Sequence, residues 1–341
     1  MKPCVVQYLY VHRPDEQFDY PTSRSHGVAA VAARYMECAL VQSASLCLRE
    51  VDCDVVLVTN LADAGLEGTR AAQLLDAIRA LGVEVLFADY LHRPVGNTAE
   101  FMSSQYVWDA IIAVAQRSED DRQLWLMDAD CVWFDPARVF AAAPAPPGIG
   151  CIQIDYPLDW DISGWTPQQV GQLAQRMGAP DSSIRWVGGE LLAGPACELR
   201  ALVDTCKEVE LQAIELGCEL HTEEHLLSLA GLLGRADFHD LSAVARRILT
   251  GPRHEAPPVQ NPAAIGVWHL PAEKGLGFRR GAHDVLSGHG ERLTRDLDVP
   301  ARALKRFNIG GAGGLQRRLR DDGWIASQRL RDSVSALVGR G

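Results

Sequence analysis

The sequence predicts an α/β fold in which helices flank a mixed central sheet, with a helical extension at the C-terminal end. In the first 130 residues, short apolar runs alternate with longer helical patterns, as expected of βαβ units and a largely parallel sheet. After Asp128 the pattern changes, because a Pro-rich turn at 144–147 separates two further strand-like runs. Together these observations favour a Rossmann-like sheet of mixed topology over an all-parallel one.

Each expected element rests on its apolar spacing, which is continuous or alternating in strands and follows the helical period in helices. Strands are expected over 5–11, 55–59, 83–88, 124–127, 150–154, 185–193 and 264–269. Helices are expected from residue 25 or 26 to about 50, over 68–81, from about 100 to 116, from near 166, and over 195–217 and 222–233. A Gly-rich stretch at 310–314 predicts a flexible break before a last amphipathic helix.

Length and charge suggest one main core with an appendage. The 341 residues are 47% hydrophobic and 23% charged, which suits a globular chain with a sizeable core. We expect a catalytic α/β domain over 1–280 and a basic helical extension over 281–341. The net charge of −11 argues against a nucleic-acid partner, which would require a basic field. The segment 301–341 differs, since it carries nine Lys and Arg against three acids.

The start of the chain and the cysteines bear on the compartment. The first ten residues lack the features of a secretory signal, and no apolar run reaches membrane-spanning length. Nine cysteines occur singly, without a Cys-x-x-Cys pair, so we expect reduced thiols. These features predict a cytoplasmic protein. The Pro-, Ala- and Arg-rich composition is typical of a GC-rich bacterial genome.

A pair of aspartates at the end of one strand is the strongest chemical signal. Asp-x-Asp occurs four times, but Asp128 and Asp130 follow the clear apolar strand 124–127, where open α/β sheets bind ligands. Asp159 and Asp161 form a rival pair beyond residue 154. Two carboxylates at this spacing can share a divalent cation that also binds the phosphates of a nucleoside diphosphate. The alternative is a solvated turn with two capping acids.

Several segments resemble one enzyme family in the expected order. The run Leu-Trp-Leu-Met-Asp-Ala-Asp-Cys-Val-Trp-Phe-Asp at 124–135 resembles the metal-binding segment of glycosyltransferases with the A-type fold, particularly family 8. The segment 186–194 is similar to its strand lining the sugar pocket, and 222–228 to its segment beside the reacting centre. The segment 266–275 is similar to its late strand with a metal-binding His and a diphosphate-binding Lys.

This resemblance implies transfer of a hexose from a nucleoside-diphosphate sugar, with a UDP-sugar favoured, to an unknown acceptor with retention. It implies that Asp128 contacts ribose or, through water, the metal, and that Asp130 and His269 are direct metal ligands. It also implies that Lys274 binds a donor phosphate. Read without the family, His269 could instead be a packed core residue of an apolar strand.

The resemblance further implies donor-binding and catalytic residues. Gly189 would line the sugar pocket and Tyr8 would contact the nucleotide, although Tyr8 could simply be a core residue. Glu190, Glu223 and Glu224 would be the catalytic carboxylates, and each departs from the residue usual in the family. Glu223 and Glu224 precede an apolar helical run, so they could instead complement a helix dipole.

A site with two carboxylates and one imidazole suits Mn²⁺ or Mg²⁺, because hard oxygen ligands favour both ions and the nitrogen favours Mn²⁺. Zinc is the third choice.

Other interpretations of the sequence stay open. The run 126–132 also resembles the first motif of haloacid-dehalogenase phosphatases, with Asp128 as nucleophile, but about 120 residues of α/β pattern precede it. A non-catalytic sugar-nucleotide-binding protein is also conceivable. The basic tail suits packing on the acidic body or peripheral membrane contact.

Overall fold

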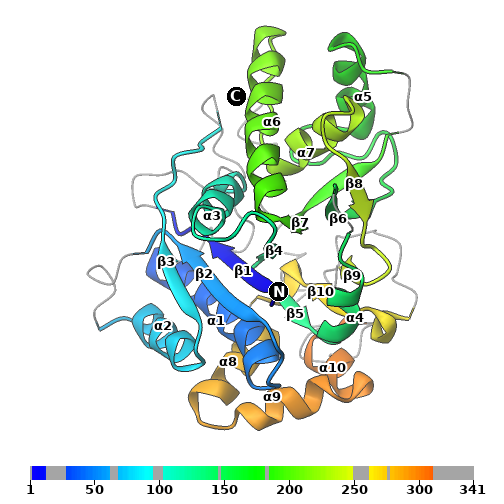
Figure 1. Ribbon diagram of the computed structural model, residues 1–341. Helices are drawn as coiled ribbons and strands as arrows, with labels where there is room; N and C mark the ends of the chain where they lie inside the picture. Colours follow the sequence, from blue (N-terminus) through cyan, green and yellow to red (C-terminus); the bar gives the residue numbers. More distant parts are fainter. Residues whose placement is uncertain are drawn as a thin grey trace, which may run out of the picture.

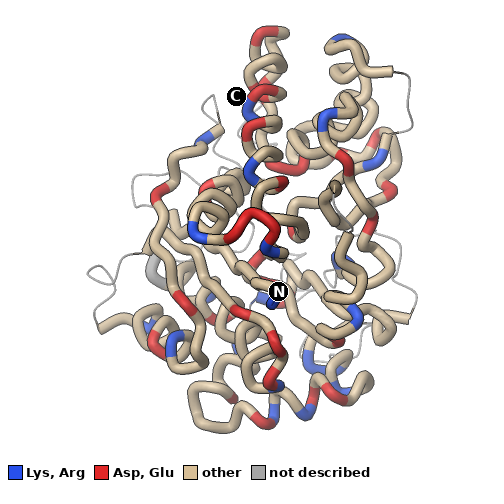
Figure 2. Tube along the Cα trace, viewed as in Figure 1, with Lys and Arg blue, Asp and Glu red and all other residues tan. Residues whose placement is uncertain are grey.

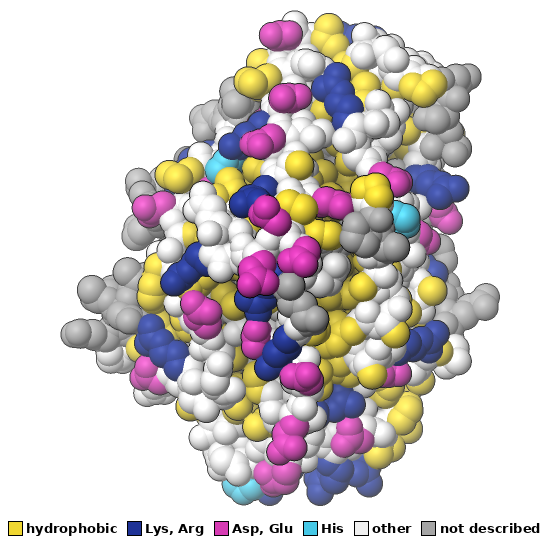
Figure 3. Space-filling model, in the orientation of Figure 1, with side chains coloured by type: hydrophobic (Ala, Val, Ile, Leu, Met, Phe, Trp, Pro, Cys, Tyr) yellow, Lys and Arg dark blue, Asp and Glu magenta, His cyan; other side chains and the backbone are white. Residues whose placement is uncertain are grey.

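A computed structural model describes residues 2–12, 28–61, 68–94, 103–144, 147–180, 184–248, 261–274 and 277–309. They form a mixed central sheet with helices on both faces, which confirms the predicted fold class (Figure 1). Acidic and basic side chains are interspersed over the face drawn in Figure 3.

The central sheet has seven strands in the order β3-β2-β1-β4-β7-β6-β8. Its strands are β1 (Cys4–Leu9), β2 (Asp54–Thr59), β3 (Glu84–Phe87), β4 (Gln123–Asp128), β6 (Ile149–Ile154), β7 (Trp186–Pro195) and β8 (Phe238–Asp240). The first four strands of this order are parallel, and β7 is antiparallel to both β4 and β6. The predicted change from parallel to mixed pairing therefore occurs directly after β4.

A smaller three-stranded sheet follows the end of β4. It consists of β5 (Cys131–Trp133), β10 (Val267–His269) and β9 (Ala245–Arg247), with β10 in the middle. Strand β5 is antiparallel to β10, and β9 is parallel to it. The turn at 129–130 links the two sheets, so the end of β4 lies beside the end of β10 (Figure 1).

Two apolar cores lie on the two faces of the central sheet, because successive strand residues point to opposite faces. Val5 contributes to one core and Val6 to the other. The first core is covered by α1 (Val28–Cys47), α2 (Arg70–Ala80), α4 (Pro136–Ala141), α8 (Gly277–Leu286), α9 (Gly290–Leu297) and α10 (Pro300–Arg306). The second is covered by α3 (Tyr106–Ala115), α5 (Pro167–Arg176), α6 (Ala196–Glu215) and α7 (Glu223–Leu232).

The last described helices pack on the first core. Phe278, Leu293 and Phe307 from α8, α9 and the end of α10 are fully buried in it. Arg306 forms ion pairs with Asp284 at 2.9 Å and Asp296 at 2.6 Å, and Figure 2 shows acidic and basic positions interspersed along α9 and α10. The division at residue 280 stays a prediction, and the predicted helix after 314 lies outside the described residues.

The late strand differs from its prediction over 264–269. Pro262–Ala264 forms a 3-10 turn, and β10 begins only at Val267. A second 3-10 turn, Pro271–Glu273, follows β10 and leads to Lys274. Proline at the first position of each turn fixes φ and cannot donate to a strand ladder. None of the described helices has the length and apolar character of a membrane span.

Candidate metal centre and active site

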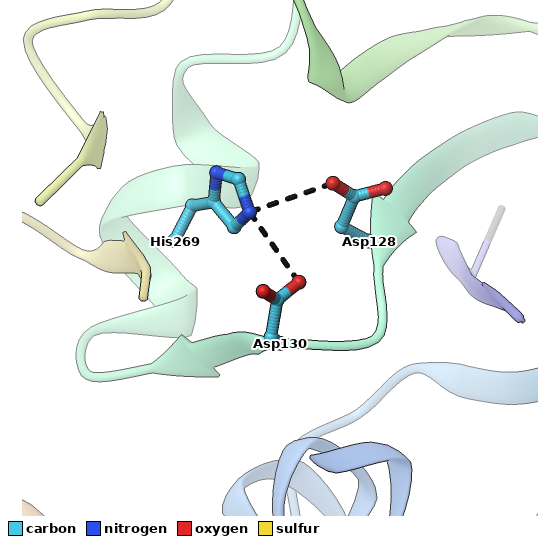
Figure 4. A group of neighbouring side chains, drawn as sticks. All are labelled: Asp128, Asp130 and His269. Carbon is cyan, nitrogen blue, oxygen red and sulfur yellow. Dashed lines mark ion pairs between the residues drawn. The ribbon is translucent and has the colours of Figure 1, made fainter. Parts of the chain in front are cut away.

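Asp128, Asp130 and His269 converge at the junction of the two sheets. Asp128 ends β4, Asp130 occupies the following turn, and His269 ends β10. His269 Nε2 lies 3.4 Å from Asp128 Oδ2 and 3.3 Å from Asp130 Oδ1 (Figure 4). The backbone fixes this approach, since Leu270 N–H donates to Asp130 O at 3.0 Å. The predicted trio is therefore assembled by the pairing of β5 with β10.

The charges around the trio are strongly coupled. Burial opposes ionisation of Asp130, but Lys274 and His269 outweigh it and hold the pKa of Asp130 below its usual range. Lys274 Nζ lies 2.9 Å from Asp130 Oδ2. Burial raises the pKa of Asp128, and the charge of Asp130 adds to that shift. Burial lowers the pKa of His269, but Asp130 and Glu190 outweigh it and raise that pKa to about 10.

The trio fits a divalent cation. One donor atom from each residue lies within 4.8 Å of the others, and two carboxylate oxygens with one imidazole nitrogen form a donor set suited to Mn²⁺ or Mg²⁺. The rival pair has a different environment, because Asp159 is exposed and Asp161 accepts a hydrogen bond from Gly164 N–H at 3.1 Å. That bond is typical of a capped turn.

Glu190 lies behind His269, on the side away from the aspartates. Its Oε1 is 3.6 Å from His269 Nδ1. Arg247 binds both of its oxygens, with Nε to Oε1 at 2.9 Å and Nη2 to Oε2 at 2.6 Å. Burial opposes ionisation of Glu190, but Arg247 and His269 outweigh it and lower its pKa to about 2. Glu190 is thus a buried anion held by two cationic partners.

Glu223 and Glu224 occupy the first turn of α7 and point toward β7. Thr222 is the N-cap, with its side chain accepting from His225 N–H. Glu224 accepts from Trp186 Nε1 at 2.8 Å and also binds Arg247. Burial raises the pKa of Glu223 well above its usual value, and the charges of Glu224 and Asp128 add to this. The two acids therefore combine a helix-start position with burial in the site.

Tyr8 and Gly189 lie between these carboxylates and the metal centre. Tyr8 is the register partner of Asp128 in the β1–β4 pair. Its hydroxyl lies 3.3 Å from Gly189 O, to which it donates. Burial raises the pKa of Tyr8, with the negative charge of Asp128 as the next cause. All nine predicted site residues consequently lie at one edge of the sheet.

Arg247 was not among the predicted site residues. It lies on β9, next to Arg246, and joins Glu190, Glu224 and the hydroxyl of Tyr156, the last at 3.0 Å. Sequence alone offers a weak signal, because a three-residue strand has no recognisable period and Arg246 is an equal candidate. Only the fold shows that Glu190 and Glu224 are buried side by side, where their negative charges require a cationic partner such as Arg247.

A methyl group on Gly189 is expected to disrupt this site. It would lie 2.1 Å from Glu223 Oε1 and 2.6 Å from Glu223 Cγ, so Gly189→Ala should lower the free energy of unfolding by about 1 to 3 kcal/mol. Urea denaturation measures the loss. Gly194→Ala on the same strand is the control, since its methyl would approach nothing closer than 3.5 Å. Equal stability of the two variants would contradict the close approach at Gly189.

Comparisons with known proteins give structural neighbours only. No protein-family model and no curated protein matches the sequence. An active-site mutant of LgtC has a TM-score of 0.48 at 13% identity, covering 84% of this chain and 95% of that chain. Galactosyltransferase LgtC in complex with donor and acceptor sugar analogues gives 0.48 at 12% identity, with the same coverage. Mouse xyloside xylosyltransferase 1 in its apo form gives 0.47 at 12%, covering 79% and 97%. At this similarity, function must be argued from the site.

Proposed function

We propose that this protein is a metal-dependent glycosyltransferase that moves a hexose from a nucleoside-diphosphate sugar to an acceptor. The observation that carries the proposal is the convergence of Asp128, Asp130 and His269 beside Lys274 at the end of β4. Two carboxylates and an imidazole suit a divalent ion, and the adjacent ammonium suits a phosphate. The resemblance of segments 124–135, 186–194, 222–228 and 266–275 to family 8 glycosyltransferases supports a UDP-sugar donor and retention.

The topology of the sheet supports this location for a nucleotide. The chain runs from β1 outward to β2 and β3, then returns to place β4 on the other side of β1. In open α/β sheets, ligands bind outside the carboxyl ends of the two strands at such a switch point. Tyr8 and Asp128 lie at the ends of these two strands. A nucleotide there would reach the trio and Lys274 together.

Each residue then has a role in the transfer. Asp130 and His269 would hold Mn²⁺ or Mg²⁺, and Asp128 would bind the ion through water or bind the ribose. When bound, the ion supplies Lewis-acid stabilisation of the departing diphosphate. Lys274 would exchange its ion pair with Asp130 for a donor phosphate, and so neutralise the leaving group.

The buried acids of α7, Glu223 and Glu224, would form the sugar side of the site. Glu224 is held in place by Arg247 and Trp186, so its carboxylate can stabilise a cationic glycosidic carbon. Glu223 has a raised pKa, which favours a protonated carboxyl that can donate to the sugar or acceptor. Gly189 leaves room for the Glu223 side chain, which lies where a side chain at residue 189 would be.

A haloacid-dehalogenase-like phosphatase is not favoured. That chemistry would use Asp128 as nucleophile and Asp130 as acid, on the opening strand of the domain. Here three strands, β1, β2 and β3, precede β4 among the residues that the structure describes. Asp130 is paired with Lys274 and has a lowered pKa, so it is poorly suited to carry a proton at neutral pH.

Calorimetric titration with UDP and then GDP, with and without Mn²⁺, tests the proposal. Wild-type protein should bind one nucleotide only with Mn²⁺, and Asp130→Ala should lose that binding by about 100-fold or more, because a direct ligand and the partner of Lys274 disappear. Asp159→Ala removes an exposed acid of the rival pair and should leave binding unchanged.

The possible results of this titration distinguish the glycosyltransferase from the phosphatase and from the non-catalytic binding protein. Failure of both nucleotides to bind wild-type protein with Mn²⁺ would reject the proposal and direct attention to phosphatase assays with Asp128→Asn as control. Binding without hydrolysis of the corresponding sugar nucleotide would favour the non-catalytic binding protein. Binding accompanied by slow donor hydrolysis would support transfer, since water can replace the acceptor.

A further inference from the structure

A chain of buried polar contacts extends from the metal trio into the sugar side of the site. His269 contacts the aspartates through Nε2 and Glu190 through Nδ1. The Glu190 side chain is 0% exposed, so no substrate can reach it in this conformation. This burial is unexpected for a residue predicted to be catalytic, and it points to a role exerted through a neighbour.

Strand register places Arg247 beside His269. The two residues are partners in the parallel β9–β10 pair, and Ile248 N–H donates to His269 O at 2.9 Å. Their side chains therefore start from neighbouring backbone positions and meet at Glu190, which comes from β7 of the central sheet. The two sheets are joined at this point by charged contacts as well as by the turn at 129–130.

We propose that Glu190, fixed by Arg247, is a positioning residue that orients the His269 ring so that Nε2 faces the divalent cation. The inference rests on the proposed function and deepens it. Histidines that bind metals commonly donate their other ring N–H to a carboxylate, which sets the tautomer and increases the basicity of the ligating nitrogen. Glu190 stands at that other nitrogen, 3.6 Å from Nδ1.

The geometry of Arg247 gives Glu190 one orientation. Its guanidinium contacts both carboxylate oxygens through Nε and Nη2, a bidentate pairing that resists rotation of the carboxylate. The same Nη2 also binds Glu224. Arg247 thereby links the support of the metal ligand to the carboxylate that would face the sugar.

Gly188 makes room for this arrangement. A methyl group there would lie 2.2 Å from Glu190 Oε2, so any larger residue would displace the carboxylate. Glu190 departs from the residue usual in the family that segment 186–194 resembles. That departure and the close fit of Gly188 to its carboxylate are explained together if this chain carries its own buried support for the metal-binding histidine.

Mn²⁺ binding measured by electron paramagnetic resonance tests the inference without any substrate. Glu190→Gln should weaken Mn²⁺ affinity by about tenfold or more. Spin-echo modulation from a directly bound nitrogen should be present in wild-type protein, absent in His269→Ala, and lost or reduced in Glu190→Gln. Asp284→Asn is the matched control, since it alters a buried carboxylate on α8 that pairs with Arg306 at 2.9 Å, outside the site, and should change affinity by less than about twofold.

The results distinguish the inference from the proposed function. If wild-type protein binds no Mn²⁺, the proposed function fails first. If wild-type protein binds Mn²⁺ with a nitrogen ligand and Glu190→Gln keeps both the affinity and the nitrogen signal, the positioning role is rejected while the metal site stands. Should Glu190→Gln fail to fold, Arg247→Lys provides the test. Its shorter, single ammonium cannot hold both oxygens, so it should weaken Mn²⁺ binding several-fold, and unchanged binding would overturn the inference.

Discussion

Arg247→Met is expected to lower the free energy of unfolding by about 3 to 5 kcal/mol, because it leaves two buried carboxylates without their cation. Arg247 is only 17% exposed, and its partners Glu190 and Glu224 are 0% and 11% exposed. Water can therefore do little to replace the lost contacts. Chemical denaturation in urea at pH 7, with the slope checked for two-state behaviour, measures the change.

An exposed ion pair provides the control. Arg200 pairs with Asp120 at the surface, where the two side chains are 38% and 73% exposed. Arg200→Met should cost about 1 kcal/mol or less. Adding Glu190→Gln to Arg247→Met should recover part of the loss, since one of the stranded charges is removed. A loss at Arg247 no larger than that at Arg200 would show that the buried network contributes little to stability.

The sequence predicts the parts of this fold that have a clear period. Long amphipathic helices such as α1 and α6, and buried strands such as β4, lie within a few residues of their expected bounds. Strands β5, β8 and β9 are only three residues long, which is too short for alternation to be recognised. Their pairing depends on partners far away in the sequence, since β5 and β9 pair with β10, and β8 pairs with β6.

The residues of the candidate site also differ in how far the sequence predicts them. Asp128 and Asp130 can be found from residue type, spacing and position after an apolar strand, because the sheet edge is a predictable place for ligands. His269 requires the resemblance of segment 266–275, since one histidine on an apolar strand is ambiguous. Arg247 cannot be found, because its partnership with Glu190 is set by the β9–β10 register and by contact between two sheets.

His225 should make the protein less stable in mild acid. Burial lowers the pKa of His225 to about 4, against an ordinary value near 6.5. The neutral ring is required by its contacts: Nδ1 accepts from the N–H groups of His221 and Thr222, both at 3.2 Å, while Nε2 lies 2.8 Å from Ile162 O. Protonation of Nδ1 would remove an acceptor at the start of α7.

The direction of this pH dependence follows from the difference in proton uptake between the unfolded and the folded chain. Between pH 4 and 6.5, His225 is protonated in the unfolded chain and neutral in the folded chain. The contribution of neutral His225 to stability is therefore fully present above pH 6.5 and is lost as pH falls toward 4. From pH 8 to pH 5 the contribution of this residue should fall by about 2 kcal/mol. Glu223 also titrates in the folded protein, and burial raises its pKa. Its contribution to stability therefore increases as pH falls, opposite to that of His225.

His225→Gln isolates the effect. Glutamine is a usual residue at this position of a capping box, so its amide can replace both the acceptor to Thr222 N–H and the donor to Ile162 O without titrating. The difference in unfolding free energy between wild type and variant, measured by urea denaturation at several pH values, cancels the titration of Glu223. That difference should shift by about 2 kcal/mol in favour of the variant from pH 8 to pH 5. A constant difference would mean that the folded protein accommodates a protonated His225 as readily as the unfolded chain does.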